Sequence, residues 1–64
     1  MYKFAKHYLA CGYVDYGKNG RCYIEFEFTS HYRADSKVNK EDARKYYKNR
    51  CGRDVVIERT TLMN

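Results

Sequence analysis

The sequence predicts an α+β fold in which two strands, one helix and a third strand form a single small domain over residues 1–64. The stretch from Asn39 to Gly52 has the start signal, the end signal and the apolar stripe of an amphipathic helix. Before it, residues 21–31 alternate between apolar and polar side chains, as a half-buried strand does. After it, residues 54–62 are rich in β-branched side chains, which predicts a last strand.

The helix is expected to begin at Asn39, whose side chain is suited to cap the first free amide groups. Glu41 and Asp42 would then lie in the first turn, where the helix dipole favours negative charge. Gly52 is expected to end the helix in the left-handed conformation. At about 100° per residue, the apolar and basic positions fall on opposite sides. The apolar side comprises Ala43, Tyr46, Tyr47 and Cys51, and the basic side comprises Lys40, Arg44, Lys45 and Lys48.

The first two strands are expected to form a hairpin. The first lies within residues 2–16, and its middle is apolar on both faces, which suits the centre of a sheet. The run Gly17-Lys18-Asn19-Gly20 predicts the turn, because Asn-Gly tolerates the positive φ angles that tight hairpins need. The second strand has two faces, namely Cys22, Ile24, Phe26 and Phe28, expected under the helix, and Tyr23, Glu25, Glu27 and Thr29, expected in solvent.

The order of the strands follows from the helical connection. A right-handed crossover from the second strand through the helix returns the third strand parallel to the second. If the third strand lies beside the first, the order is 2-1-3 and all neighbours are antiparallel. Because the first strand is the least polar, we expect this three-stranded antiparallel sheet, with the helix packed on one face.

Length and composition limit the function. A chain of 64 residues buries only about 60% of the surface that its unfolded form exposes, so no large enclosed substrate pocket is expected. Aromatic residues make up 17% of the chain and proline is absent, which predicts an ordered domain. The first seven residues lack the apolar run of a signal peptide, and no segment is long enough to cross a bilayer. The expected location is therefore cytoplasmic.

Three widely spaced cysteines, Cys11, Cys22 and Cys51, predict reduced thiols rather than a disulfide framework. Cys22 and Cys51 are expected to be buried. Zinc sites usually contain a closely spaced pair of ligands, whereas His7 and Cys11 would lie about 13 Å apart along one strand. We expect no metal and no other cofactor. Cys51 lies at the negative end of the helix, which disfavours a nucleophilic thiolate.

Glu25 and Glu27 are the one candidate pair of catalytic carboxylates. They would point the same way about 7 Å apart, a separation compatible with such a pair. Alternation places them on the uncovered face of the sheet with no pocket above them, so solvated surface is the better interpretation. No catalytic residue is predicted.

Positive charge is the feature that stands out. The net charge is +5, and residues 32–53 alone carry eight basic and three acidic side chains. Such a surface attracts phosphates or the acidic patch of a partner protein, although a solvated helix face that keeps the protein soluble is a competing interpretation. The predicted partner-binding residues are Arg33, Lys37, Lys40, Arg44, Lys45, Lys48 and Arg53.

One resemblance adds to this interpretation. The run Glu41-Asp42-Ala43-Arg44, leading through Gly52 into Asp54-Val55-Val56-Ile57-Glu58-Arg59, resembles in layout small phage-encoded host-takeover proteins such as the host RNA polymerase inhibitors of T7-like phages. The resemblance covers about half of the chain and transfers no functional residue. It implies a compact, non-enzymatic accessory protein that binds and modulates or inhibits a host machine in the host cytoplasm.

Two functions therefore remain open. The first is a non-catalytic binding module that docks its basic helix face, or the open sheet face with Tyr23, on a host protein with an acidic or nucleic-acid-like surface. The alternative is direct, low-specificity binding of nucleic acid by the same basic face. We expect a monomer or homodimer with no membrane partner and no small-molecule substrate. An enzyme is the least favoured class.

Overall fold

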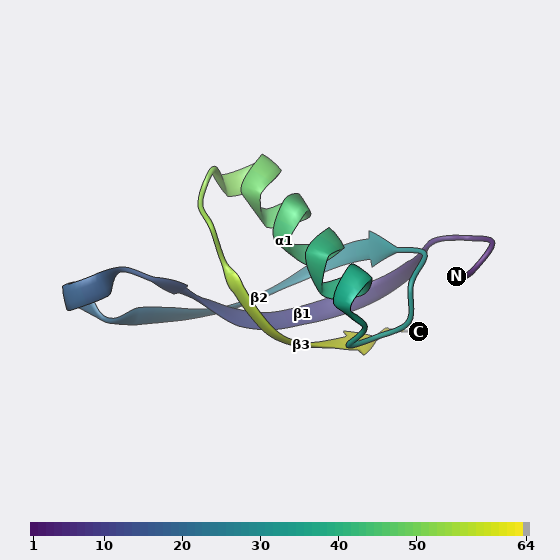
Figure 1. Cartoon of the computed structure of the whole chain (residues 1–64), viewed down its shortest axis with the longest axis horizontal. Coiled ribbons are helices and arrows are strands. Elements are labelled where there is room, and N and C mark those ends of the chain that lie inside the picture. Colours follow the sequence, from purple (N-terminus) through teal and green to yellow (C-terminus); the bar gives the residue numbers. More distant parts are fainter. Residues whose placement is uncertain (64) are drawn as a thin grey trace.

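The computed structural model describes residues 1–63, which form one three-stranded sheet and one α-helix. The elements are β1 (Lys6–Asp15), the 3-10 turn η1 (Gly17–Asn19), β2 (Arg21–Ser30), α1 (Lys37–Cys51) and β3 (Val56–Leu62). The sheet order is β2-β1-β3 and both pairings are antiparallel, which confirms the predicted α+β topology. In Figure 1, α1 lies on one side of the sheet. No helix of the described chain is both long and apolar enough to cross a membrane.

The β1–β2 hairpin is a long arm with an unexpected turn at its tip. The two strands pair without interruption from Lys6 opposite Ser30 to Asp15 opposite Arg21. The predicted hairpin and its turn over residues 17–20 are confirmed, but the positive φ angles fall on Gly17 (67°) and Gly20 (88°) and not on Asn19. Instead a 3-10 turn closes the arm, and Asp15 Oδ1 accepts a hydrogen bond from the Gly17 amide at 2.8 Å. The arm gives the molecule a long axis of 42 Å (Figure 1).

The helix cap lies three residues earlier than predicted. Ser36 is the N-cap, and its Oγ accepts a hydrogen bond from the Asn39 amide at 3.2 Å. Asn39 is therefore not the cap, and Glu41 and Asp42 lie beyond the first turn. The predicted end was correct, because Gly52 has a φ of 71° and its amide donates to the Lys48 carbonyl at 2.8 Å.

The core lies between α1 and the facing side of the sheet. Phe28 is buried and its ring stacks on Tyr8 with centroids 5.6 Å apart. Phe26 packs against Tyr47 at 5.2 Å, so the predicted contact of the second strand with the helix is confirmed. The buried apolar residues are Tyr8, Ala10, Val14, Phe28, Ala43, Val55 and Ile57.

Cys22 and Cys51 were predicted to be buried, but both are exposed. Cys51 is the last residue of α1, and Cys22 is the second residue of β2 next to the turn of the arm. Both therefore lie at the end of the sheet where the hairpin continues beyond the helix (Figure 1). Both cysteines occupy positions of the apolar pattern in their element. They are nevertheless exposed, because at that end of the sheet the helix no longer covers β2.

The first turn of α1 and β3 are joined by a network of buried polar groups. Thr60 Oγ1 donates to Asn39 Oδ1 at 2.6 Å, and Asn39 Nδ2 donates to the Tyr32 carbonyl at 2.8 Å. Asp35 adopts a left-handed φ of 63°, and its Oδ1 accepts from the Thr60 amide at 2.7 Å. Asn39 is fully buried and Thr60 is 3% exposed, so these hydrogen bonds satisfy groups that water cannot reach. The network fixes the helix start against the last strand.

Tyr8 is the exception to this pattern, because its hydroxyl is buried with no hydrogen-bond partner among the described residues. We expect Tyr8→Phe to keep the stability of the protein or raise it by about 1 kcal/mol, since an unpaired buried hydroxyl costs free energy.

Burial also raises the pKa of Tyr8 above its ordinary value. The unfolded chain releases this proton near pH 10, before the folded protein does, so stability should fall as the pH rises above about 10.

Urea denaturation of both proteins at neutral pH and above pH 10 tests this expectation, and the alkaline loss should be smaller in Tyr8→Phe. A variant that is less stable than the wild type by more than about 1 kcal/mol would show that the hydroxyl has a bonding partner.

Candidate partner-binding groove

A groove of about 750 Å³ runs between α1 and the segment that leads into β3. One wall is the helix, and the other is the chain that returns from the helix end into the last strand (Figure 1). The groove is open to solvent rather than enclosed. Its lining residues are Lys37, Lys40, Glu41, Arg44, Lys45, Lys48, Asn49, Asp54, Val55, Val56 and Ile57.

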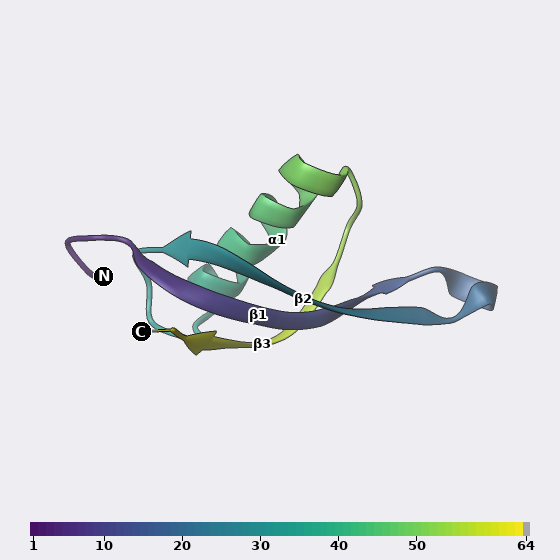
Figure 2. The same cartoon turned by 180° about the vertical axis from the view of Figure 1, so that it is seen from behind.

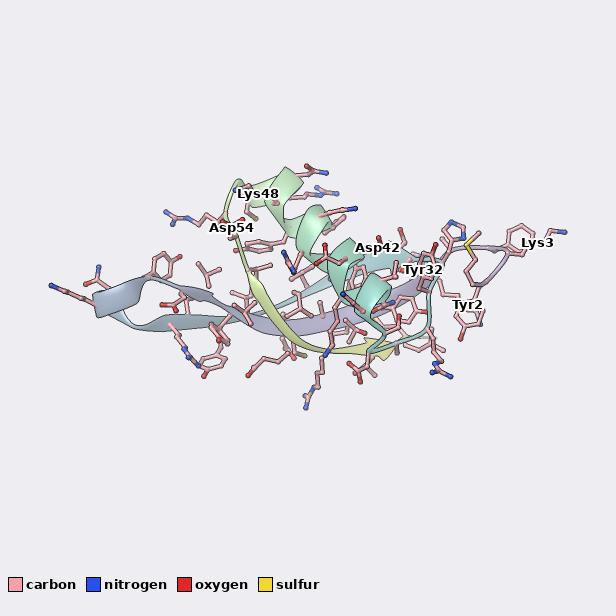
Figure 3. All side chains as sticks on the ribbon, in the orientation of Figure 1. Tyr2, Lys3, Tyr32, Asp42, Lys48 and Asp54 are labelled. Atoms are coloured by element: carbon pink, nitrogen blue, oxygen red, sulfur yellow. The ribbon has the colours of Figure 1, made fainter. Side chains whose placement is uncertain are left out.

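The helix wall is basic because of its residue spacing. Lys40, Arg44 and Lys48 follow one another at four-residue intervals, so their side chains leave the same side of the helix. The wall is not a continuous row of unpaired cations. Arg44 pairs with Glu41 one turn earlier, and Lys48 Nζ lies 3.3 Å from Asp54 Oδ1 (Figure 3).

These two ion pairs are weak restraints. Their side chains are exposed, and that of Asp54 is 96% exposed, so solvent screens the pairing. Among residues 1–63, Lys37, Lys40 and Lys45 have no carboxylate within ion-pair distance. An incoming carboxylate would therefore find three unpaired ammonium groups and two cations whose present partners are easily replaced.

The opposite wall is apolar, and sequence reasoning did not include it in the site. Val55 and Ile57 are 6% and 9% exposed, whereas Val56 is 45% exposed. A stretch of three β-branched residues signals a strand, but it does not reveal that this strand faces the basic side of the helix. The groove thus has basic side chains on one side and, on the other, Val55 and Ile57, which expose little of their surface.

The structure brings five of the seven predicted partner-binding residues to this groove, namely Lys37, Lys40, Arg44, Lys45 and Lys48. Arg33 and Arg53 lie outside its lining. Arg33 belongs to the loop before α1, where its carbonyl accepts a hydrogen bond from Ser36 Oγ. The guanidinium of Arg53 lies 5.2 Å from the centre of the Tyr16 ring, beside the hairpin arm. Whether any of the seven binds a partner stays a prediction.

The other face of the sheet carries a second, smaller hollow of about 390 Å³. The helix leaves this face uncovered in both views (Figures 1 and 2). Cys11 Sγ donates to Glu25 Oε2 at 3.3 Å, and Tyr23 is 66% exposed with its ring 5.6 Å from that of Tyr13. Glu25 and Glu27 are exposed, as predicted for solvated strand residues. This face mixes acidic, aromatic and basic groups without a dominant charge.

In the part of the chain that the structure describes, no three histidine, cysteine, aspartate or glutamate side chains cluster as metal ligands do. In comparisons with known proteins, no family model, no curated protein and no solved structure matched this chain. The resemblance to phage inhibitors therefore stays a prediction.

Proposed function

We propose that this protein is a non-catalytic binding module whose groove binds an acidic segment of a partner protein. The observation that supports this proposal is the composition of the groove, in which five lysine and arginine side chains lie opposite a chain segment of three aliphatic residues, 55–57. A partner with carboxylates and apolar side chains would gain ion pairs on one side and bury apolar surface on the other.

The alternative partner, nucleic acid, would use only half of this site. Phosphates would pair with the cations, but a sugar-phosphate backbone offers no aliphatic surface to Val55, Val56 and Ile57. Glu41 and Asp54 also lie in the lining and would repel phosphates. A peptide can place its own carboxylates away from these two positions, which favours a protein partner.

Only the resemblance to small phage-encoded proteins indicates which kind of host protein the partner is. Small phage proteins of this layout imply a host enzyme whose activity is modulated or inhibited when the module binds. The groove supplies the chemistry of such an interaction, and the resemblance supplies its biological setting.

A charge-reversal variant tests the groove. We expect Lys40→Glu/Arg44→Glu/Lys48→Glu to weaken binding of a fluorescent poly-glutamate peptide at least about tenfold, because three attractive contacts become repulsive. The control Lys3→Glu/Lys6→Glu/Lys18→Glu makes the same change in net charge at positions outside the groove. It should weaken binding much less. Fluorescence anisotropy measures both affinities at physiological salt, and circular dichroism checks that both variants fold.

The same experiment with a DNA duplex distinguishes the alternative. Nucleic-acid binding by three or four phosphate contacts would give a plot of log affinity against log salt with a slope of about −3. Tight, salt-dependent binding of the duplex together with no binding of poly-glutamate would reject the protein-partner proposal. If the groove variant and the control lose the same affinity for poly-glutamate, the net charge of the protein and not the groove attracts acidic polymers.

A further inference from the structure

The last strand has one edge that is largely unpaired. β3 pairs with β1 on one side, and no third strand lies on its other side in the described sheet. At Thr60 that outer edge is covered, because the Thr60 amide donates to Asp35 Oδ1 and the Asp35 amide donates to Thr60 Oγ1. Towards the start of β3 the chain instead lines the groove. The uncovered part of the edge is therefore the part that faces the proposed site.

The backbone of this part is oriented towards the groove. The Val56 carbonyl points at β1, since its oxygen would lie only 2.0 Å from a Cβ placed on Gly12. The backbone groups of successive strand residues point to opposite edges. The amide and carbonyl of Ile57, which follows Val56, therefore point away from β1. They are hydrogen-bonding groups at the edge of a site that already carries charge and apolar surface.

We infer that the acidic partner segment binds in an extended conformation and adds a fourth strand to the free edge of the sheet along residues 55–57, where the chain enters β3. This inference rests on the proposed function, because it specifies the conformation and the sequence pattern of the ligand of the same groove. Backbone hydrogen bonds to the edge supply affinity, and side chains that alternate between the two faces of the added strand supply specificity.

The spacing of the basic wall fits such a strand. Residues four apart on a helix, such as Lys40, Arg44 and Lys48, are separated by about 6 Å along the axis. Side chains on one face of a strand are separated by about 6.6 Å. Because α1 crosses the sheet obliquely (Figure 1), this match extends over only a few residues. Two or three acidic side chains at every second position of the ligand would therefore each meet one cation.

The intervening side chains of the ligand would lie on the other face of the enlarged sheet. There Val56, which is 45% exposed, offers an aliphatic surface at the start of β3. The inferred recognition pattern is thus acidic and aliphatic residues in strict alternation. A helical acidic ligand would present its charges with a period of 3.6 residues and would leave the backbone edge of β3 unpaired.

Three short peptides test this inference, and all are acetylated, amidated and built from alternating glutamate and valine. One is unmodified, one is N-methylated at the glutamates and one at the valines. N-methylation at alternate residues removes the hydrogen-bond donors from one edge of an extended peptide only. We expect one methylated peptide to bind like the unmodified peptide and the other at least about tenfold more weakly, because up to two backbone hydrogen bonds to the carbonyls of Val55 and Ile57 are lost. The amide of Ile57 should exchange more slowly in the complex.

The outcomes separate the two proposals. If both methylated peptides bind as tightly as the unmodified peptide, and Lys40→Glu/Arg44→Glu/Lys48→Glu still weakens all three, strand addition is wrong and the proposed function stands. If neither these peptides nor poly-glutamate binds, both proposals fail. If the protein alone associates with increasing concentration in sedimentation and the peptide does not compete, the edge is occupied by a second copy of this chain, which also overturns the inference.

Discussion

Replacing Gly12 with alanine is expected to destabilise the protein by about 3 kcal/mol or more, because the added methyl group has no space. The new Cβ would lie 2.0 Å from the Val56 carbonyl oxygen and 3.0 Å from its carbonyl carbon. Both are backbone atoms of β3, so relief requires β1 and β3 to separate. A small domain has a total stability of only about 5 kcal/mol, so this one methyl group removes most of it.

The matched control is Gly17→Ala in the turn of the arm. Gly17 has a φ of 67° but nothing within 4 Å of an added Cβ, so alanine there meets only backbone strain of about 1–2 kcal/mol. Urea denaturation gives the two free energies of unfolding. A Gly12→Ala protein no less stable than Gly17→Ala would contradict the close approach of β3 to β1 at this register shift.

The second large effect is expected for Phe28→Ala, at about 3–5 kcal/mol. Phe28 is 2% exposed and stacks on Tyr8 beneath the helix, so truncation removes buried area and leaves a cavity. Tyr23→Ala on the same strand is the control, because Tyr23 is 66% exposed on the opposite face. It should cost about 1 kcal/mol or less, the value of one cross-strand pair with Tyr13.

Thermal or urea unfolding of both variants, followed by circular dichroism, measures this contrast. Comparable losses in the two variants would mean that the buried and exposed faces of β2 had been assigned the wrong way round.

The topology could be predicted because several local signals agreed. The alternation along β2, the apolar middle of β1 and the right-handed crossover were enough to choose the order β2-β1-β3. The helix end was also predictable, since Gly52 adopts the left-handed conformation that glycine tolerates best. Each of these signals acts between residues that are near in sequence or within one element.

The errors arose where distant residues decide the structure. Asn39 has the side chain of a capping residue, but Thr60 and the Tyr32 carbonyl bind that side chain inside the fold, and Ser36 takes the capping position instead. No local pattern distinguishes these two uses of asparagine. The apolar spacing of Cys22 and Cys51 likewise predicted burial, whereas their exposure depends on where the helix stops covering the sheet.

The candidate site was predictable only on its helix side. Spacing alone placed Lys40, Arg44 and Lys48 on one ridge, and the structure brings all three to the groove. The opposite wall could not be assigned, because the proximity of residues 55–57 to this ridge depends on how the chain that enters β3 packs beside the helix. Arg33 and Arg53 were included for their charge and sequence position, but neither belongs to the groove lining.

The hairpin arm implies that stability is distributed unevenly along the molecule. Its outer half extends past the end of the helix, and every residue from Asp15 to Tyr23 is exposed (Figure 1). Backbone hydrogen bonds there are held by the two strands alone, so the tip can fray while Tyr8, Phe28 and Ala43 stay packed. Amide protons near the turn would then exchange through local opening, and those of the inner strands only when the whole domain unfolds.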